Sequence, residues 1–120
     1  MGGADAGLER SSVPPAVQVL MTTATEVEAQ TIAAALVDGH LAACVQVLGP
    51  VESWFWWEGR RQRTREWLCL AKTTADRYEA LEAAVRERHS YDVPEIMAIP
   101  VVHGSERYLR WLADSVHPTS

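Results

Sequence analysis

The sequence predicts an α+β domain of the ferredoxin-like class, with the order β-α-β-β-α-β and one extra helix at the C-terminus. Two observations support this prediction. Short runs rich in β-branched residues alternate with segments in which apolar residues recur at helical spacing. The order of these segments is that of the split β-α-β unit, whose helices cover one face of a sheet. A chain of 120 residues is long enough for one such domain.

The first half of the domain begins with the apolar run VQVLMTT, which predicts a strand over residues 17–23. A helix over about residues 25–38 follows. Thr25 and Glu28 have the spacing of a capping box at its start. Gly39 is expected to be the left-handed residue that ends it.

A long hairpin is predicted next. LAACVQVL forms a strand over residues 41–48, and Gly49-Pro50 interrupts it with a bulge or bend because proline cannot donate to the ladder. The chain continues as an extended segment over residues 52–57, here called the aromatic arm. Glu58-Gly59 is a plausible hairpin tip, and the return strand covers about residues 63–73.

The second half is predicted to contain two helices separated by a strand. The first helix, residues 75–89, is capped by Thr73 or Thr74, and its inward residues are Tyr78, Leu81, Ala84 and Val85. The strand covers residues 95–102, and Pro100 places its far end at a sheet edge or bulge. Ser105 caps the last helix, residues 105–116, whose inward residues are Tyr108, Leu109 and Leu112.

The two ends and the composition limit the function classes. Residues 1–16 are rich in Gly, Ala, Ser and Pro and are expected to be a disordered tail, so the domain spans residues 17–116. The net charge of −5 makes nucleic acid an unexpected partner. No apolar run reaches the roughly 18 residues of a membrane span, and residues 1–16 have no secretory signal pattern. We expect a cytoplasmic protein whose two cysteines, Cys44 and Cys69, are buried hydrophobic residues.

The aromatic arm raises the question of what covers it. On a strand, Trp54 and Trp56 point to one face and Phe55 and Trp57 to the other. The simplest alternative is that one aromatic pair is exposed to solvent, but a run of aromatic residues on both faces indicates an interface. We therefore predict self-association through the arm.

Several segments carry a resemblance to a known family. LAACVQV, SWFWWEG, LCLAKTT, HSYDVPEIMAIPV and GSERYLRWL follow one another at the spacing of the CutA family, the divalent-cation tolerance proteins. The resemblance covers about residues 17–116. It implies a ferredoxin-like fold assembled as a homotrimer, in which the long hairpin reaches onto neighbouring subunits. Trp54, Phe55, Trp56, Trp57 and Trp67 would then form the trimer interface.

The resemblance also implies a metal site, although this sequence departs from the family there. Copper binding attributed to the family uses a cysteine on the first strand and a His-His pair. The corresponding residues here are Met21 and Arg88-His89. His89 remains as a ligand for copper(II) or another divalent cation, with Glu95 as a second candidate. The family's usual His-Pro-Tyr is His89-Ser90-Tyr91 in this chain.

Each candidate residue has an alternative role. His89 ends a helix, where the dipole favours its cationic form, so it can serve as a cap or line a cleft instead of binding metal. Glu95 is either a metal or ligand group or the partner of an arginine in an interface ion pair. The basic residues after the arm are an anion site or a solvated hairpin tip; they are Arg60, Arg61, Arg63 and Arg65.

These residues lead to three hypotheses. The first is a non-enzymatic CutA-like homotrimer in divalent-cation tolerance, with weak copper binding at most. The second is a trimeric small-molecule sensor resembling PII-type nitrogen regulators, with its ligand in an inter-subunit cleft lined by His89, Tyr91 and Glu95. The third is an enzyme with an unknown substrate. The sequence has neither a glycine-rich phosphate loop before a helix nor a G-x-S-x-G elbow, so only the fold class supports the third.

Overall fold

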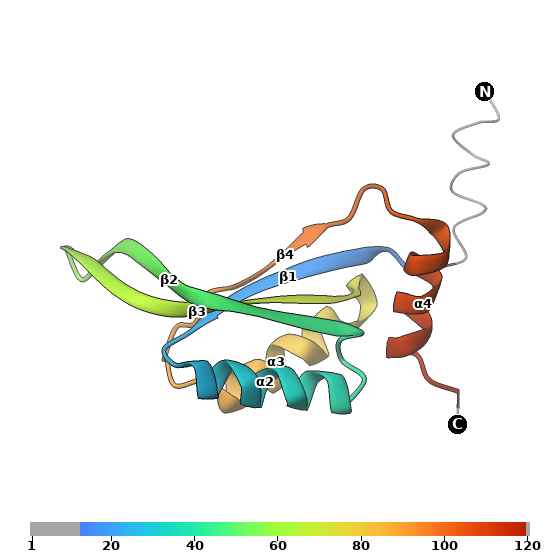
Figure 1. Ribbon diagram of the computed structural model, residues 1–120, viewed down its shortest axis with the longest axis horizontal. Coiled ribbons are helices and arrows are strands. Elements are labelled where there is room, and N and C mark those ends of the chain that lie inside the picture. The colour runs from blue at the N-terminus through green and yellow to red at the C-terminus, as the bar shows by residue number, and fades with distance from the viewer. Residues whose placement is uncertain (1–12, 120) are drawn as a thin grey trace.

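The computed structural model describes residues 13–119. In chain order the elements are β1 (Ala16–Thr23), α2 (Glu26–Asp38), β2 (Cys44–Trp57), β3 (Arg60–Thr74), the short 3-10 helix η1 (Ala75–Arg77), α3 (Tyr78–Arg88), β4 (Ile96–Pro100) and α4 (Glu106–Val116). The strands form one antiparallel sheet in the order β2-β3-β1-β4. Figure 1 shows α2 and α3 together on one face of this sheet. The predicted ferredoxin-like α+β fold is confirmed.

The hydrophobic core lies between the sheet and the α2–α3 layer. Every second residue of β1 points toward the helices, as the two-residue period of a strand requires. The helices supply residues at three- and four-residue spacing, because these positions share one helical face. The main buried residues of this cluster are Val17, Val19, Met21, Ala29, Ile32, Leu36, Cys69, Ala71, Leu81 and Val85.

The N-terminal cap of α2 is the predicted one, but the residue with left-handed backbone after its C-terminus is not. The Thr25 hydroxyl accepts a hydrogen bond from the Glu28 amide, at 3.1 Å. Gly39, however, has φ −87°, and the left-handed residue is His40, with φ 56°. The helix ends at Asp38 as predicted, and the amides of His40 and Leu41 donate to the carbonyls of Val37 and Leu36 in its last turn. Histidine is among the residues that tolerate this conformation, and its Nδ1 lies 2.9 Å from the Ser115 carbonyl oxygen.

The long hairpin of β2 and β3 extends well past the helices (Figure 1). The predicted irregularity at Gly49-Pro50 is present, between Leu48 and Val51. A Cβ atom on Gly49 would lie only 2.7 Å from the Trp67 ring, so glycine lets the strand and the indole pack closely. Glu58 and Gly59 form the tip with φ values of 52° and 75°, as a two-residue hairpin turn requires. The pairing starts at Arg60, earlier than predicted, because the ladder continues through the whole aromatic arm.

The second half of the fold follows the predicted order, with two changes of detail. The 3-10 helix η1 leads into α3, which therefore begins at Tyr78 and not at residue 75. The predicted inward residues of α3 lie in or against the core. β4 pairs only with β1, so Pro100 is on an edge strand, where a missing N–H is tolerated.

α4 lies across one end of the sheet (Figure 1). Ser105 caps it as predicted, since its hydroxyl accepts from the Tyr108 amide at 3.1 Å. The buried face carries Leu112, Ala113 and Val116. The prediction that Tyr108 points inward was wrong: its ring is exposed and lies beside Trp111, with centroids 5.4 Å apart. The first turn of α4, which carries Tyr108, is largely exposed, and the buried residues lie in the last two turns.

The last residues of the predicted tail contact the domain. Residues 1–12 of the predicted tail are outside the described residues. Residues 13–16 pack on the domain: Ala16 is buried in β1, and the Pro15 carbonyl accepts from the Ala75 amide at 2.8 Å. Over residues 13–119, no helix is long and apolar enough to cross a membrane.

The His117 side chain, at the end of α4, contacts Asp76 of η1. Its Nε2 lies 2.8 Å from Asp76 Oδ2, and its Nδ1 lies 2.8 Å from the Ala113 carbonyl oxygen. Both neighbours are acceptors, so the imidazolium form satisfies both. The hydrogen bond to the Ala113 carbonyl, and then Asp76, raise the pKa of His117, against the opposing effects of burial and of nearby Arg77. Hydrogen bonds from Thr74 and His117 lower the pKa of Asp76.

This contact should make stability depend on pH. A raised histidine pKa gives stability that is full below its unfolded value of 6.5 and is lost as the pH rises through the folded value. We expect His117→Gln to lower the free energy of unfolding by up to about 1 kcal/mol at pH 5.5, because the pair is partly exposed. At pH 8.5 the difference should nearly vanish. Urea unfolding at both pH values measures this, with His103→Gln as the control; an equal loss at both would contradict the proposed charge effect.

Candidate functional site

The turn after α3 is held by the buried ring of His89. The Tyr91 amide donates to His89 Nδ1 at 3.0 Å, so Nδ1 carries no proton. His89 Nε2 lies 2.7 Å from the Thr22 carbonyl oxygen and therefore donates to it. The side chain of His89 is 0% exposed. Nε2 thus connects the turn to β1, and Nδ1, which carries the only ring lone pair, accepts a hydrogen bond within the turn.

Glu28 connects the start of α2 to the same turn. Its Oε2 accepts from the Ser90 amide at 2.6 Å, and its Oε1 accepts from the Ser90 hydroxyl at 3.1 Å. The Ala24 amide also donates to Oε1, at 3.2 Å. A proline in place of Ser90 could make neither bond, since it lacks both an N–H and a hydroxyl. The serine of this chain therefore adds its own link between α2 and the turn.

Tyr91 extends the network to the hairpin. Its hydroxyl donates to Glu66 Oε2 at 2.8 Å, across 25 positions of sequence. Glu66 lies on β3 and is only 6% exposed. Burial, followed by the hydrogen bond to Glu66 and its charge, raises the pKa of Tyr91 to about 12. The phenol consequently stays protonated and remains a donor to the carboxylate at neutral pH.

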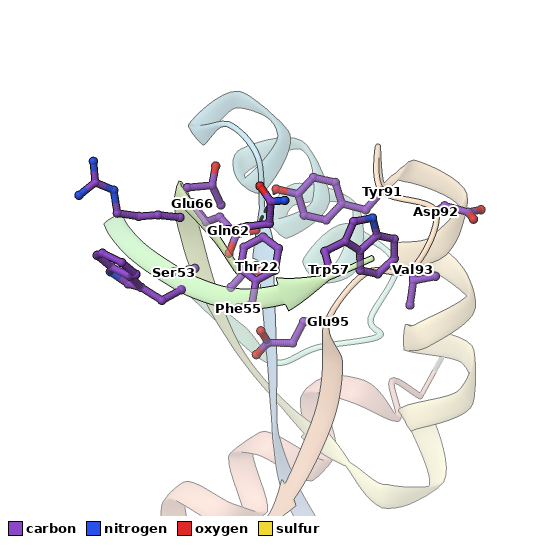
Figure 2. Close-up of a pocket in the computed structure, with 13 residues that line it drawn as sticks. Thr22, Ser53, Phe55, Trp57, Gln62, Glu66, Tyr91, Asp92, Val93 and Glu95 are labelled. Carbon is purple, nitrogen blue, oxygen red and sulfur yellow. Dashed lines mark hydrogen bonds between the residues drawn. The ribbon is translucent and has the colours of Figure 1, made fainter. Parts of the chain in front are cut away.

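A cavity of about 820 Å³ opens beside this network. One wall is the aromatic arm and the facing part of β3, and the other is the segment of residues 91–95. Figure 2 shows the Phe55, Trp57 and Tyr91 rings around this space, with Glu66 and Glu95 also at its walls. The site therefore combines aromatic surface with carboxylates.

The predicted cleft residues lie at different depths. Tyr91 and Glu95 line the cavity. His89 stands behind Tyr91, with their rings 4.9 Å apart, and is fully buried. Glu95 makes no ion pair with any residue from 13 to 119 of its own chain. The arginine partner predicted as the alternative role of Glu95 is therefore not found among residues 13–119.

The aromatic arm is exposed on both faces, as its alternation indicated. Trp56 is 74% exposed, and Phe55 and Trp57 are also exposed. Trp54 donates to Glu52 at 2.9 Å, and the guanidinium groups of the facing arginines lie over its ring; these are Arg61 at 4.9 Å and Arg63 at 5.3 Å. Part of the basic run is thus bound to the arm itself. Trp67 differs from the arm residues because it packs against the core and Gly49.

The residues at the positions of the family's metal ligands have other contacts in this chain. Met21 is fully buried in the core. Arg88 is exposed, and its guanidinium donates to the Ala84 carbonyl at 2.8 Å. Within residues 13–119 no three or more His, Cys, Asp or Glu side chains are grouped to hold a metal ion. Cys69 is buried, and burial followed by the charge of Glu28 raises the pKa of its thiol to about 11, while Cys44 is half-buried.

Sequence reasoning missed two carboxylates of the network. Glu28 was assigned only to the capping box, and Glu66 was given no role. Glu66 does carry a signal, since it is an acidic residue at the start of the apolar run WLCLAKT. The contacts of both depend on residues distant in sequence, so spacing alone could not reveal them.

Comparison with known proteins gives one consistent family. The family model described as CutA1 divalent ion tolerance protein matches residues 17–115. The Thermus thermophilus divalent-cation tolerance protein CutA is 41% identical over 97 residues, covering 81% of this chain and 94% of that protein. The chloroplastic protein CutA 1 of Oryza sativa is 36% identical over 105 residues, covering 88% of this chain but only 59% of the rice protein. The crystal structure of CutA1 from Oryza sativa superposes with a TM-score of 0.85 at 34% identity, covering 89% of this chain and 98% of that one.

Proposed function

Because the chain belongs to the CutA1 divalent ion tolerance protein family, we propose that it acts in divalent-cation tolerance, as a homotrimer and without enzymatic activity. The observation that carries the proposal is the family match over residues 17–115, which is nearly all of the described chain. A cytoplasmic location is part of the proposal, although two relatives are named as chloroplastic and the Archaeoglobus fulgidus protein as periplasmic.

The homotrimer is supported by apolar surface that one chain leaves exposed. The aromatic arm exposes large rings on both faces and extends beyond the helices. The sheet face opposite α2 and α3 also has exposed apolar residues at one edge, including Met97 and Ile99. Surface of this kind marks an interface between proteins. Trp54, Phe55, Trp56 and Trp57 would supply most of the contact, and Trp67 would support the base of the hairpin.

Metal binding would require groups from more than one subunit. Glu95 lines the cavity without an ion-pair partner, and its carboxylate suits a hard divalent cation. Copper(II) prefers imidazole nitrogen, but His89 would have to give up a hydrogen bond to Thr22 or Tyr91 to bind it. We propose Glu95 as the direct ligand, with His89 as the residue that positions the turn.

Native mass spectrometry of the full chain with copper(II) tests this assignment. We expect a trimer, and we expect Glu95→Gln to weaken copper(II) uptake at least about tenfold, which is about 1.4 kcal/mol. Glu79→Gln, at an exposed position of α3, is the matched control and should bind as the unaltered protein does. Equal uptake by all three proteins would leave only adventitious metal sites. A monomer would contradict the assembly.

A second candidate function is supported by the cavity itself. Its volume of about 820 Å³ is in the range of small-molecule sites. Tyr91 and Glu95 line it, and His89 fixes Tyr91 from behind. We therefore also propose a sensor role of the PII type, in which a small molecule occupies this cavity and a partner protein responds to it.

A further inference from the structure

We propose that the cavity binds a small organic cation, namely a primary ammonium compound that carries an aromatic or apolar group. This inference rests on the second proposed function, the sensor role, and names the class of its ligand. It depends on three features of the cavity: the net charge of its wall, the burial of Glu66 without an ion-pair partner among the described residues, and the aromatic rings around the space.

The cavity wall carries an excess of negative charge. Glu66, Asp92 and Glu95 all line it. Arg63 is the only cationic residue among the described lining residues. Like charges across a binding site disfavour a partner strongly. The part of the wall that one subunit supplies therefore disfavours phosphates and carboxylates as ligands and favours a cation.

Arg63 does not offset this charge, because its side chain belongs to the other face of the hairpin. It pairs in register with Trp54, whereas the next pair along the ladder is Phe55 with Gln62. Neighbouring residues of a strand point to opposite faces. The Arg63 guanidinium accordingly lies over the Trp54 ring and 3.7 Å from Glu52.

Glu66 is the part of the wall that most needs a cation. It is 94% buried, since only 6% of it is exposed, and it has no ion pair with any residue from 13 to 119. Tyr91 donates to Oε2, and no hydrogen bond to Oε1 is found among the described residues. A buried carboxylate without a cation is unfavourable. A ligand ammonium group in the cavity would supply the missing charge and further N–H donors.

The aromatic surface selects an organic cation over a bare metal ion. Phe55 and Trp57 share one face of the arm, and Tyr91 lies across from them (Figure 2). Aromatic faces attract ammonium groups and pack against apolar groups of a ligand. Within residues 13–119 no set of His, Cys, Asp and Glu side chains is grouped for a metal. An amine with an aromatic or apolar body matches both parts of the wall.

The test uses three probes of similar shape and different charge: 2-phenylethylamine, 2-phenylethanol and 3-phenylpropionate. Isothermal titration calorimetry is performed on the full chain in its native assembly. We expect the amine to bind at least about tenfold more tightly than the other two probes. Glu66→Gln and Glu95→Gln should each weaken amine binding at least about fivefold. Glu79→Gln is the control and should leave it unchanged.

Other outcomes separate this inference from the sensor role. Tighter binding of the anionic or neutral probe would overturn the ligand class and leave a small-molecule site in place. Amine binding that is unaffected in both cavity variants would overturn the location. If no probe binds, and a metabolite mixture also leaves the melting temperature unchanged, the sensor role fails as well. Glu95→Gln keeps the test valid if Glu66→Gln does not fold, because Glu95 is exposed.

Discussion

Trp56→Glu is expected to convert the proposed trimer into folded monomers at low micromolar concentration. Trp56 is 74% exposed in one chain, so the substitution should leave the fold of a single subunit intact. In the proposed trimer the indole is covered by a neighbouring subunit. A glutamate there would lose hydration without gaining a partner, which costs several kcal/mol for each buried carboxylate. Size-exclusion chromatography with light scattering measures the mass, and circular dichroism checks the fold.

Val27→Glu is the matched control for this substitution. Val27 is an apolar residue of similar exposure, at 70%, but it lies on α2 and not on the hairpin. The control should remain a trimer. If Trp56→Glu also remains a trimer, the arm is not the basis of the assembly. If both variants dissociate, the loss reflects added negative charge in general and not the aromatic arm.

The second large effect is expected from His89→Ala. The substitution removes a ring whose side chain is 0% exposed and which connects Thr22 with Tyr91. It leaves a cavity and two backbone groups without their partners, each of which costs about 1–3 kcal/mol when buried. We expect the free energy of unfolding to fall by about 3 kcal/mol. Urea unfolding with a constant slope measures this loss.

Two variants with amide side chains test the two hydrogen bonds of the imidazole one at a time. His89→Asn can place an acceptor near the Nδ1 position and keep the hydrogen bond from the Tyr91 amide. His89→Gln can place a donor near the Nε2 position and keep the hydrogen bond to the Thr22 carbonyl. Both should recover part of the loss. His103→Ala, at an exposed histidine, is the control and should change stability by less than about 0.5 kcal/mol. A loss below about 1 kcal/mol in His89→Ala would contradict the structural role.

The elements of the fold could be predicted because their signals are local. Apolar residues at two-residue or helical spacing indicate strands and helices wherever one face is buried. Thr25 and Ser105 cap their helices through hydrogen bonds that span three positions. Glu58-Gly59 forms the hairpin tip because the turn needs residues that accept positive φ. Each of these features depends on neighbours within a few residues.

The wrong predictions concern positions where the local sequence pattern fits two neighbouring residues or two helix faces equally well. Gly39 satisfies the pattern of a left-handed cap, but His40 takes that conformation and contacts Ser115, which is 75 positions away. Tyr108 has the spacing of an inward residue, but Leu112, Ala113 and Val116 form the buried face of α4. The sheet end on which α4 packs decides the rotation of the helix, and its shape is not present in the helix sequence.

For the candidate site, the sequence by itself determined the family, the aromatic arm and the chemistry available at His89, Tyr91 and Glu95. Only the tertiary structure decided that His89 is buried behind the cavity, while Tyr91 and Glu95 line it. It also brought Glu66 to Tyr91 and Glu28 to Ser90, across 25 and 62 positions. The physical reason is that burial and hydrogen-bond partners are set when distant segments pack. The sequence specifies which functional side chains are available, but only the packing of distant segments decides which of them contact one another.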